Sequence, residues 1–439
     1  MDSRYITAAS IAALLGAICA TGKLEAAPHL STLYTFQGGA DGASPFTETL
    51  VPGPGGSLYG STRAGTSGSA AVFQLSPPAN GGTPWNYTLL QSFAGDQNGG
   101  RPTALLAGPH GSLFGEAILG GNQACGEGCG LVFQLIPPSH GRTQWSETIL
   151  YAFSGTDGAF PRDGLIPDGQ GNLFGTTVSS GQSGSCNGCG TVFELSPPAM
   201  GRKSWSLATL YTFKPDDFPG GKLLPDQNGG FYGITWGGGK HLSVCNSYYY
   251  GRCGTVYHLA PSGNRMSAWR KTTLYEFTGH EDGQTPYSEL TLDNAGNVLG
   301  MAMDGGLHAH CQTNPGGCGT AFRLTPPARG QGSWTFSLLW QFTGKRDGNQ
   351  PVAAGLTPFN GNYVTTTAGD AESDFGTVDL FTPGAPGQRW SGRTLFTFTN
   401  DANGADPESY LLQRDGVFYG MTHGDSGPAP YGTVFSLVP

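Results

Sequence analysis

Short hydrophobic runs separated by turn residues recur along the chain, and one complete unit occupies residues 164–213. In this unit the run 173–177 (LFGTT) is followed by 190–195 (GTVFEL), and Trp205 precedes Phe213 by eight residues. Each run has four to six residues, is rich in β-branched and aromatic side chains, and is bounded by Gly, Pro, Asn or Asp. This pattern predicts short β-strands, and no segment after the N-terminus has sustained helical periodicity.

Three landmarks of this unit, its two hydrophobic runs and the phenylalanine after the tryptophan, occur seven times each at spacings of 55 to 67 residues. The first landmark recurs at Tyr59, Phe114, Phe174, Tyr232, Leu299, Val364 and Tyr419. The second recurs at Phe73, Phe133, Phe193, Tyr257, Phe322, Asp379 and Phe435. The third recurs at Phe36, Phe93, Phe153, Phe213, Phe277, Phe342 and Phe398. About four short strands at this period predict a β-propeller blade, since solenoid repeats usually have roughly 20 to 45 residues.

The expected fold is therefore all-β, a seven-bladed β-propeller closed by an N-terminal strand that completes the last blade. Each phenylalanine of the third landmark except Phe36 has a tryptophan eight residues before it. These tryptophans are Trp85, Trp145, Trp205, Trp269, Trp334 and Trp390. The last unit stops at Pro439, four residues after Phe435, and lacks its final strand. We expect the spare strand Leu33–Phe36 to take that place, because closure removes exposed sheet edges. The tryptophan and phenylalanine columns should pack between adjacent blades.

The motifs LYTF and LYAF, the DGxxP turn, GNLFGTT and GTVFEL resemble the GloVer tandem-repeat family of bacterial surface and secreted proteins. The resemblance covers essentially the whole chain after residue 30 and is specific for the repeat. It implies β-propeller-like repeats, but no reaction, ligand or catalytic residue. No functional residue is therefore carried over from the family.

The N-terminal residues have the pattern of an export signal. Arg4 supplies a positive charge, and Ile6–Ala20 is an apolar stretch of small residues that is too short to span a bilayer. We predict a signal peptide at residues 1–27 and a single propeller domain at residues 31–439, with no membrane span. The protein is expected to be secreted, periplasmic or at the cell surface, and to be a monomer.

Eight cysteines form four local pairs, which agrees with export. The pairs are Cys125 with Cys129, Cys186 with Cys189, Cys245 with Cys253, and Cys311 with Cys318. Each pair lies in one loop of its unit, between the first and second landmarks, and this placement predicts disulfides. No metal site is predicted, because zinc needs ligands that converge and each pair belongs to a separate blade. The spacing of Cys186 and Cys189 suits redox chemistry, but its βαβ context is missing.

Composition excludes several classes of function. A net charge of -9 without any basic stripe disfavours a nucleic-acid partner. The sequence contains no GxSxG, HExxH, P-loop or dinucleotide motif, so it predicts no cofactor. The Asp-Gly loops are expected to be tight turns, because one carboxylate per loop is too few for calcium.

Binding should occur on the face that carries the Asp-Gly loops and the cysteine loops. Strand direction alternates within a blade, so both loop families emerge on this face, and they are the longest and most divergent loops. Positions where one unit departs from the others are the best candidates for function. We therefore predict ligand contacts at strand ends opening onto this face: Arg63, Glu116, Trp236, Asp304 and His423. The alternative is that these residues are solvated loop starts without a function.

The fourth unit has the longest loop, residues 240–253, which contains Tyr248 and Tyr249. Tyrosines on a loop bounded by a disulfide suit sugar or protein recognition, because their side chains are flat, rigid and half-polar. The alternative is that these tyrosines pack on the neighbouring blade.

These observations favour an exported, non-catalytic recognition scaffold that binds an extracellular glycan or protein through the disulfide-stapled loop face. One alternative is a polysaccharide-acting hydrolase or lyase with its site at the mouth of the central channel, using Asp304, Glu116, His423 or Arg63. Paired carboxylates about 5 to 10 Å apart in one pocket would favour that alternative. A second alternative is a structural surface protein.

Overall fold

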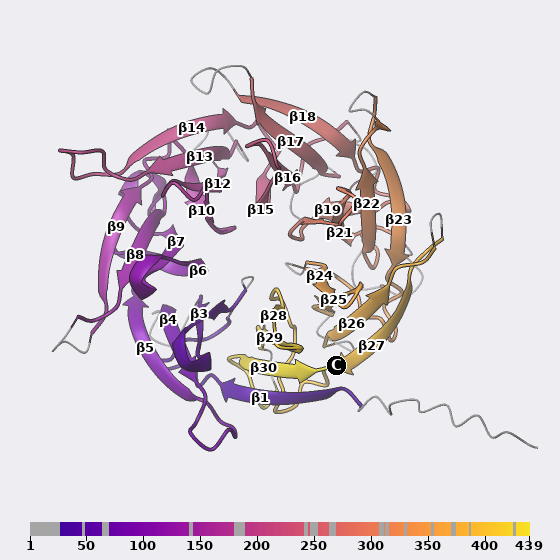
Figure 1. Cartoon of the computed structure of the whole chain (residues 1–439), viewed down its shortest axis with the longest axis horizontal. Helices are drawn as coiled ribbons and strands as arrows, with labels where there is room; N and C mark the ends of the chain where they lie inside the picture. Colours follow the sequence, from indigo (N-terminus) through magenta and orange to yellow (C-terminus); the bar gives the residue numbers. More distant parts are fainter. Residues whose placement is uncertain are drawn as a thin grey trace, which may run out of the picture.

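A computed structural model shows seven antiparallel sheets arranged as blades around a common axis (Figure 1). It describes residues 27–45, 49–63, 70–139, 144–179, 189–240, 245, 253–262, 269–306, 311, 316–328, 332–352, 355–369, 375–385, 388–424 and 427–439. Each blade has four strands from the axis outward, and in blades 3 and 5 the innermost strand is divided into two segments. The predicted all-β, seven-bladed propeller is confirmed.

The first four blades follow one another along the chain. Blade 1 contains β2 (Val51–Pro52), β3 (Leu58–Thr62), β4 (Ala70–Ser76) and β5 (Asn86–Phe93). Blade 2 contains β6 (Gly100–Ala107), β7 (Leu113–Leu119), β8 (Leu131–Ile136) and β9 (Ser146–Ala152). Blade 3 contains β10 (Ala159–Pro161), β11 (Ile166–Pro167), β12 (Leu173–Ser179), β13 (Thr191–Ser196) and β14 (Ser206–Thr212). Blade 4 contains β15 (Pro219–Pro225), β16 (Phe231–Thr235), β17 (Thr255–Pro261) and β18 (Trp269–Glu276).

The remaining blades complete the ring. Blade 5 contains β19 (Gln284–Pro286), β20 (Thr291–Leu292), β21 (Val298–Asp304), β22 (Thr320–Thr325) and β23 (Thr335–Gln341). Blade 6 contains β24 (Thr357–Phe359), β25 (Asn362–Thr367), β26 (Thr377–Thr382) and β27 (Ser391–Thr397). Blade 7 contains β28 (Leu412–Arg414), β29 (Val417–Thr422), β30 (Thr433–Val438) and β1 (His29–Thr35). Short 3-10 turns occur at Pro54–Gly56, Pro109–Gly111 and Gln123–Cys125.

The N-terminal strand closes the ring, as predicted. Strand β1 is the outermost strand of blade 7 and pairs antiparallel with β30, with His29 opposite Val438 and Thr35 opposite Thr433. In Figure 1 the indigo β1 lies beside the yellow β30. The two ends of the propeller therefore share one sheet, and β30 is paired along both of its edges.

Position within the blade explains the hydrophobic pattern. The third strand lies between two neighbouring blades, so in β13 residues Thr191, Val192, Phe193 and Leu195 are buried. The outermost strand has one face in solvent, and β14 of the same blade contains no fully buried residue. The second landmark therefore has an almost continuous apolar run, whereas the outer strand is more polar.

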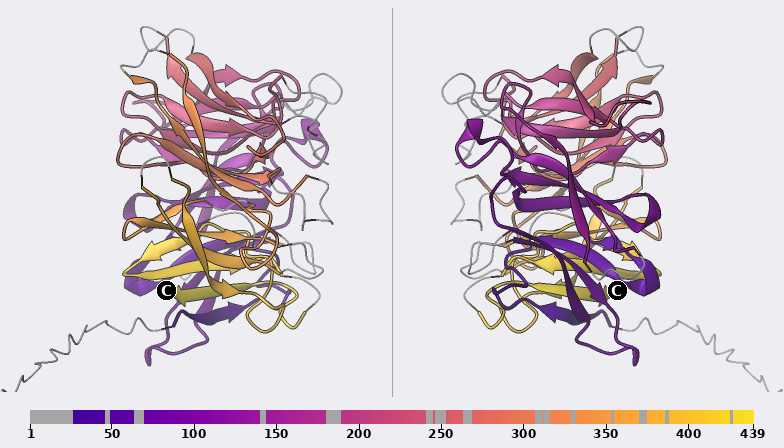
Figure 2. Two further views of the ribbon diagram at one scale, coloured as in Figure 1. Left: turned by 90° about the vertical axis from the view of Figure 1, so that its right-hand side faces the viewer. Right: turned by 90° about the vertical axis from the view of Figure 1, so that its left-hand side faces the viewer.

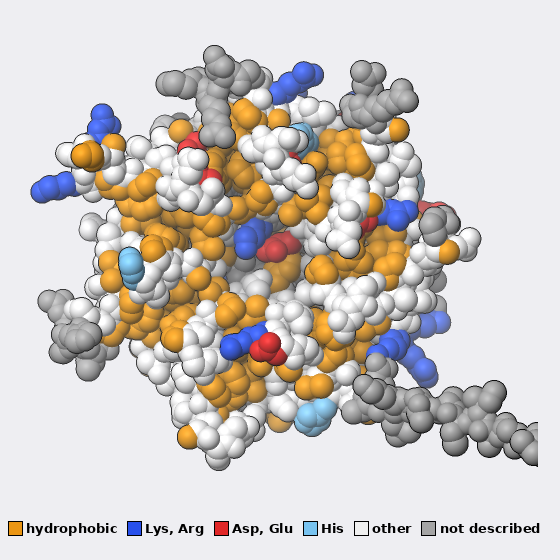
Figure 3. Space-filling model, in the orientation of Figure 1, with side chains coloured by type: hydrophobic (Ala, Val, Ile, Leu, Met, Phe, Trp, Pro, Cys, Tyr) orange, Lys and Arg blue, Asp and Glu red, His pale blue; other side chains and the backbone are white. Residues whose placement is uncertain are grey.

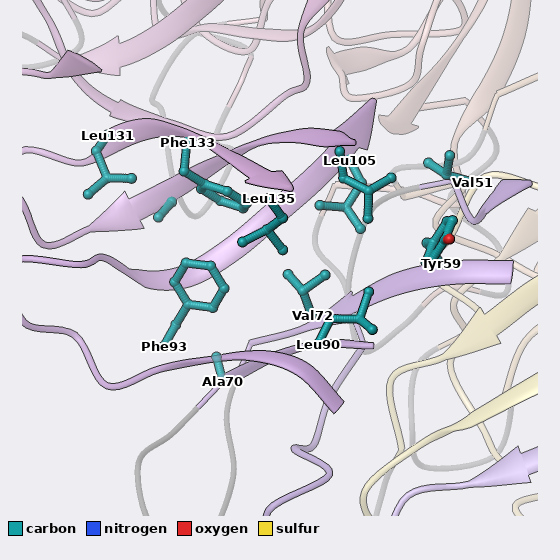
Figure 4. Packing of buried hydrophobic residues seen from close by; sticks show 12 residues of the cluster. Val51, Tyr59, Ala70, Val72, Leu90, Phe93, Leu105, Leu131, Phe133 and Leu135 are labelled. Carbon is teal, nitrogen blue, oxygen red and sulfur yellow. The ribbon is translucent and has the colours of Figure 1, made fainter. Parts of the chain in front are cut away.

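The third-landmark phenylalanines join each blade to the next. All seven are buried, and they form the pairs Phe36–Phe73, Phe93–Phe133, Phe153–Phe193, Phe213–Tyr257, Phe277–Phe322, Phe342–Phe381 and Phe398–Phe435. Ring centroids are 4.9 to 5.9 Å apart. Figure 4 shows Phe93 and Phe133 among the buried leucines and valines of blades 1 and 2. Each buried aromatic contributes about 2 kcal/mol or more, so this belt stabilises every joint.

Blade 6 departs from this belt because Asp379 stands where the other blades have an aromatic ring. Its buried carboxylate accepts hydrogen bonds from the hydroxyls of Thr377 and Thr394. Phe342 of blade 5 packs on Phe381 instead, two residues further along the same strand. Hydroxyl donors thus satisfy the buried carboxylate, while the aromatic contact moves within the strand.

The tryptophan column also joins blades, but these side chains are mostly half-buried. Four of them contact the first-landmark aromatic of the preceding blade: Trp85 on Tyr419, Trp145 on Tyr59, Trp205 on Phe114 and Trp334 on Tyr232. Trp269 and Trp390 stack on Phe231 and Tyr363 of their own blades. Among the tryptophans of this column only Trp390 is fully buried.

Three predicted disulfides are present within the described residues: Cys125–Cys129, Cys245–Cys253 and Cys311–Cys318. Cys189 is also disulfide-bonded, whereas its predicted partner Cys186 lies outside the described residues. Local disulfides of this kind are typical of extracellular or periplasmic proteins.

The cysteine loops hold adjacent blades together. The carbonyl oxygens of Cys129, Cys253 and Cys318 accept hydrogen bonds from backbone N–H groups of the next blade's innermost strand or of the loop before it, at 2.9 to 3.1 Å. Each of these disulfides therefore fixes a carbonyl group at an inter-blade joint.

The predicted signal peptide lies almost wholly outside the described residues, which begin at residue 27. Within the described part of the chain, no helix has the length and apolar character needed to cross a membrane.

Candidate functional site

The Asp-Gly loops and cysteine loops lie on one face of the ring, as predicted. Gly121, after β7, donates its backbone N–H to Asp96 O at 3.3 Å, and Gly306, after β21, donates to His280 O at 2.8 Å. We call this side of the disc the loop face. Figure 2 shows the disc from the side, with strands running between its two faces. The turns between the first two strands of each blade lie on the opposite face.

Aspartates of the Asp-Gly loops serve the turns. Asp282 accepts hydrogen bonds from the Thr278 N–H at 2.8 Å and from the Tyr275 hydroxyl at 2.9 Å. Asp41, Asp157 and Asp347 make equivalent contacts with the end of the preceding outer strand. The loop face therefore has rigid turns whose carboxylates are already used by the fold.

Around the axis, a proline lies in or shortly before the innermost strand of each blade, and the residue before that proline has a left-handed backbone. These residues are Ser44, Arg101, Phe160, Phe218, Thr285, Gln350 and Asp406, with φ between 48 and 61°. This conformation is uncommon outside glycine and especially before proline. Hydrogen bonds compensate for it: Phe218 O accepts from Trp236 N at 2.9 Å, and Thr285 N donates to Cys253 O at 2.9 Å. They fix the strand starts around the axis at the loop face.

Six blades each bring one charged or aromatic side chain to this region, which we call the axial cluster. Its members, in blade order, are Arg63, Arg101, Arg162, Trp236, Tyr287 and Glu408. Arg63 and Trp236 follow second strands, whereas the other four flank the proline of an innermost strand.

Arg162 organises the cluster. Its guanidinium carbon lies 4.9 Å from the Trp236 ring centroid, and its Nη2 donates to the Tyr287 hydroxyl at 2.8 Å. The rings of Trp236 and Tyr287 stack with centroids 4.7 Å apart. Three blades thus form one cation–aromatic layer, an arrangement that holds the guanidinium plane in a fixed orientation. The Arg162 side chain remains 18% exposed.

Trp236 can lie in this layer because blade 4 has glycine where its neighbours have large side chains. Gly220 occupies the position of Arg162 in blade 3 and Tyr287 in blade 5. A Cβ at Gly220 would be only 2.2 Å from Trp236 Cε2. The indole is 1% exposed, so its role is to support Arg162 and Tyr287.

Arg63 and Arg101 lie next to one another on adjacent blades. Ser61 in β3 donates its hydroxyl to Thr103 O in β6 at 2.9 Å. Arg63 and Arg101 are each two residues nearer the loop face on these antiparallel strands. Burial lowers the pKa of Arg63, and the positive charges of Arg162 and Arg101 lower it further. The guanidinium groups of Arg162 and Arg101 are therefore both within electrostatic reach of Arg63.

Acidic groups border these arginines. Burial raises the pKa of Glu408 to about 8, and nearby Asp406 adds to the rise while Arg63 and Arg162 oppose it. Burial raises the pKa of Asp163 to about 6 against the pull of Arg162, whose Nε lies 3.7 Å from the carboxylate. At neutral pH Glu408 therefore mostly keeps its proton, whereas Asp163 is mostly ionised.

A second layer of charge lies deeper along the axis. Lys222 and Glu289 occupy equivalent positions of blades 4 and 5, and Lys222 opposes the rise that burial imposes on the pKa of Glu289. Figure 3 shows a basic and an acidic side chain together at the middle of the ring.

The structure brings together only part of the predicted site. Arg63 and Trp236 converge in the axial cluster, and His423 lies beside it, donating its backbone N–H to Asp406 O at 2.9 Å. Asp304 is 3% exposed at the end of β21, where its backbone pairs with Gln284. Tyr248 and Tyr249 lie outside the described residues.

Glu116 lies within β7 instead of at a strand end on the loop face, and it is completely buried. Its Oε2 accepts the Gly164 N–H of blade 3 at 2.9 Å. Ser61, at the same position of blade 1, instead donates its hydroxyl to Thr103 O of blade 2. Burial raises the pKa of Glu116 to about 8. Among the described residues its Oε1 has no hydrogen-bond partner. Glu116 therefore joins two blades and does not line the loop face.

Sequence reasoning missed Arg101, Arg162, Tyr287 and Glu408. For the last three the signal was available, because the column after the repeated proline reads Thr103, Arg162, Gly220, Tyr287, Val352 and Glu408 in blades 2 to 7. Arg101 stands one residue before that proline and is not in this column. This column departs from unit to unit as strongly as the column containing Arg63 and Trp236. The described residues include no group of three or more His, Cys, Asp or Glu side chains arranged to hold a metal ion.

Solved structures are similar to this chain at low sequence identity. The PQQ-bound aldose sugar dehydrogenase of Streptomyces coelicolor is 12% identical, with 94% of this chain and 99% of that chain covered and a TM-score of 0.46. An extracellular domain assigned to a hybrid two component system of B. thetaiotaomicron is 12% identical, with 94% of this chain and 42% of that chain covered and a TM-score of 0.50. An α-L-arabinanase of Penicillium chrysogenum is 11% identical, with 93% of this chain and 97% of that chain covered and a TM-score of 0.44. The similarity at a TM-score of 0.50 shows the fold alone.

No curated protein has significant sequence similarity to the chain. A family model described as the Gloeobacter/Verrucomicrobia repeat matches residues 15–184 and 127–314. The two matches together cover more than half of the 439 residues. The chain therefore belongs to the Gloeobacter/Verrucomicrobia repeat family.

Proposed function

We propose that the protein is an exported, non-catalytic recognition propeller that binds a glycan at the axial cluster of the loop face. The observation that carries this proposal is the convergence of side chains from six blades on one region. Only 12% of the residues are charged, yet this region holds three arginines and two acids, Asp163 and Glu408. Such a concentration of polar groups on a rigid scaffold is typical of a binding site.

Export is part of this proposal. The signal peptide expected at residues 1–27 would direct the chain out of the cytoplasm, and residues 31–439 would form one propeller domain. The local disulfides support this location, because such bonds persist in oxidising compartments.

A glycan suits the axial cluster better than a flat protein surface. Arg162 is only 18% exposed and Arg63 is half-buried, so a partner must reach them with a narrow polar group. Guanidinium, hydroxyl and protonated carboxyl groups can all hydrogen-bond sugar hydroxyls.

A glycan array tests this proposal. The mature protein and the variants Arg162→Gln and Arg202→Gln would be compared at equal concentration. Arg202 is an exposed arginine on the opposite face, so its variant is a matched control. We expect specific glycan binding that falls by about tenfold or more in Arg162→Gln and is unchanged in Arg202→Gln. Absence of glycan binding, or capture of a protein partner only, would overturn the proposal.

A second candidate is a polysaccharide hydrolase or lyase at the same place. The observation in its favour is that Glu408 and Asp163, with pKa values raised to about 8 and about 6, both lie near Arg162. A carboxylic acid that is protonated at neutral pH can act as a general acid. Release of reducing ends or unsaturated products from a polysaccharide panel, abolished in Glu408→Gln, would select this function. Binding without cleavage would select the recognition scaffold.

A further inference from the structure

Three arginines on consecutive blades converge on one side of the axis. Arg63 and Arg101 are positioned by the Ser61–Thr103 hydrogen bond between blades 1 and 2, and Arg162 by Trp236 and Tyr287. Arg101 is exposed and the other two are partly buried. Like charges held this close repel each other, and partial burial strengthens the repulsion because it reduces screening by water. A bound anion would relieve this cost.

From this geometry we infer that the axial cluster binds an acidic sugar, whose anionic group is held by Arg63, Arg101 and Arg162. The inference rests on the proposed function and names the chemical class of the glycan. A carboxylate fits best, since a guanidinium group can donate parallel hydrogen bonds to its oxygens. A sulfate ester shares this chemistry, so the experiment treats the two separately.

Neighbouring acids do not remove this preference. The carboxyl of Glu408 faces Arg63 and Arg162 and mostly keeps its proton at neutral pH. Asp163 is the ion-pair partner of Arg162. It also accepts hydrogen bonds from the Gly221 N–H and the Thr176 hydroxyl. Asp406 lies next to Glu408. Arg63 and Arg162 therefore lie near a carboxyl group that is mostly protonated, and this group repels an incoming anion less than a carboxylate would.

The ring order also orients the ligand. The arginines come from blades 1 to 3, whereas Tyr287 comes from blade 5 and Glu408 from blade 7, which follows blade 6 and adjoins blade 1. The anionic group of the sugar would point toward blades 1 to 3. Its hydroxyls would then meet the phenol of Tyr287 and the protonated carboxyl of Glu408, both of which can donate and accept hydrogen bonds.

Paired ligands that differ only in charge test the inference. Oligogalacturonate would be compared with its methyl ester, and a sulfated galactan oligosaccharide with its desulfated form, by calorimetric titration. The proteins are wild type, Arg63→Gln and the control Arg202→Gln. Arg63→Gln is chosen because Arg162 also supports neighbouring aromatic rings, so its replacement can disturb packing.

We expect wild type to bind a charged form at least about tenfold more tightly than its neutral partner, with an affinity that falls as salt rises. Arg63→Gln should lose that preference, and Arg202→Gln should keep it. Preference for the carboxylate pair or for the sulfate pair identifies the source of the anion. Equal binding of charged and neutral forms would overturn the acidic-sugar inference while leaving glycan recognition intact.

Inorganic sulfate separates the two proposals further. At constant ionic strength it should raise the melting temperature of wild type more than that of Arg63→Gln, because it needs only the arginines. If sulfate stabilises wild type in this way but neither sugar pair binds, the anion site stands and the glycan function falls. If neither sulfate nor any sugar binds, both proposals are overturned.

Discussion

Phe36, the residue after β1, packs edge-on against Phe73 of β4, with ring centroids 5.3 Å apart, and this contact closes the ring between blades 7 and 1. The two residues come from blades at opposite ends of the repeat array. The same contact recurs at the other joints, so the closing joint is equivalent to the rest.

Phe36→Ala should therefore destabilise the protein as much as Phe93→Ala, by about 3 to 5 kcal/mol each, because each change leaves a cavity at one joint. Leu89→Ala in the same strand as Phe93 is the control, since Leu89 is 42% exposed and should change stability by less than about 0.5 kcal/mol. Denaturant unfolding measures all three. If Phe36→Ala unfolds like the parent protein, the N-terminal strand does not close the ring.

Gly220→Ala should disturb the axial cluster from within blade 4. The added methyl group would collide with the Trp236 indole, so we expect a loss of about 1 to 3 kcal/mol on unfolding. Gly82→Ala is the matched control, because a Cβ at Gly82 meets only the Asn80 side chain, at 3.7 Å or more. In the double variant with Trp236→Ala the two costs should not add, since the collision no longer occurs. Strictly additive costs would contradict this packing.

Removing the Cys245–Cys253 disulfide should loosen the joint between blades 4 and 5. Replacing both cysteines by alanine should cost about 2 to 3 kcal/mol, because the closed loop is short and Cys253 O accepts the Thr285 N–H. Reductant should lower the melting temperature of wild type more than that of this variant.

Peptide mapping without reduction should also identify a Cys186–Cys189 bridge, and a free Cys186 thiol would contradict that pairing.

Glu116 should make stability fall as pH rises. Its pKa is raised from 4.5 to about 8 in the folded protein, so the native state holds a proton that the unfolded chain releases. The resulting stability is present below pH about 4.5 and is lost as pH rises to about 8. Glu116→Gln should remove a loss on the order of 2 to 4 kcal/mol between those pH values. Urea unfolding at both pH values measures it.

Glu127→Gln is the control for this pH experiment, because Glu127 is exposed on the same blade. It should keep the pH dependence of wild type, to which Glu408 and Asp163 also contribute with the same sign. If Glu116→Gln and wild type lose the same stability between the two pH values, Glu116 does not titrate as we describe.

The repeat made the fold predictable from sequence. Seven phenylalanines at a constant offset predicted seven joints, and the missing tryptophan before Phe36 predicted the closing strand. Asp379 was counted correctly as a second landmark although its chemistry differs, because the spacing of its neighbours identified the strand. Phe381 supplies the aromatic contact to Phe342 that Asp379 cannot make, and the spacing of the repeat alone does not reveal this packing.

The site was only partly predictable, because proximity at the axis crosses blades. Arg162 meets Tyr287 although 125 residues separate them, and no local motif records that contact. Glu116 was assigned to the surface because it departs from its column. However, a long side chain in that column reaches the neighbouring blade instead of solvent. Trp236 departed from its column for a reason visible in sequence, the glycine at position 220, but only the structure links the two.

Hydrogen exchange measured by mass spectrometry with and without an acidic oligosaccharide tests the location of the binding site most directly. Oligogalacturonate is the first ligand to use. The account predicts slower exchange in peptides that contain Arg63, Arg101 and Arg162, and unchanged exchange in the turn 168–172 on the opposite face. Protection of that turn or of other opposite-face turns, without protection around the three arginines, would contradict it.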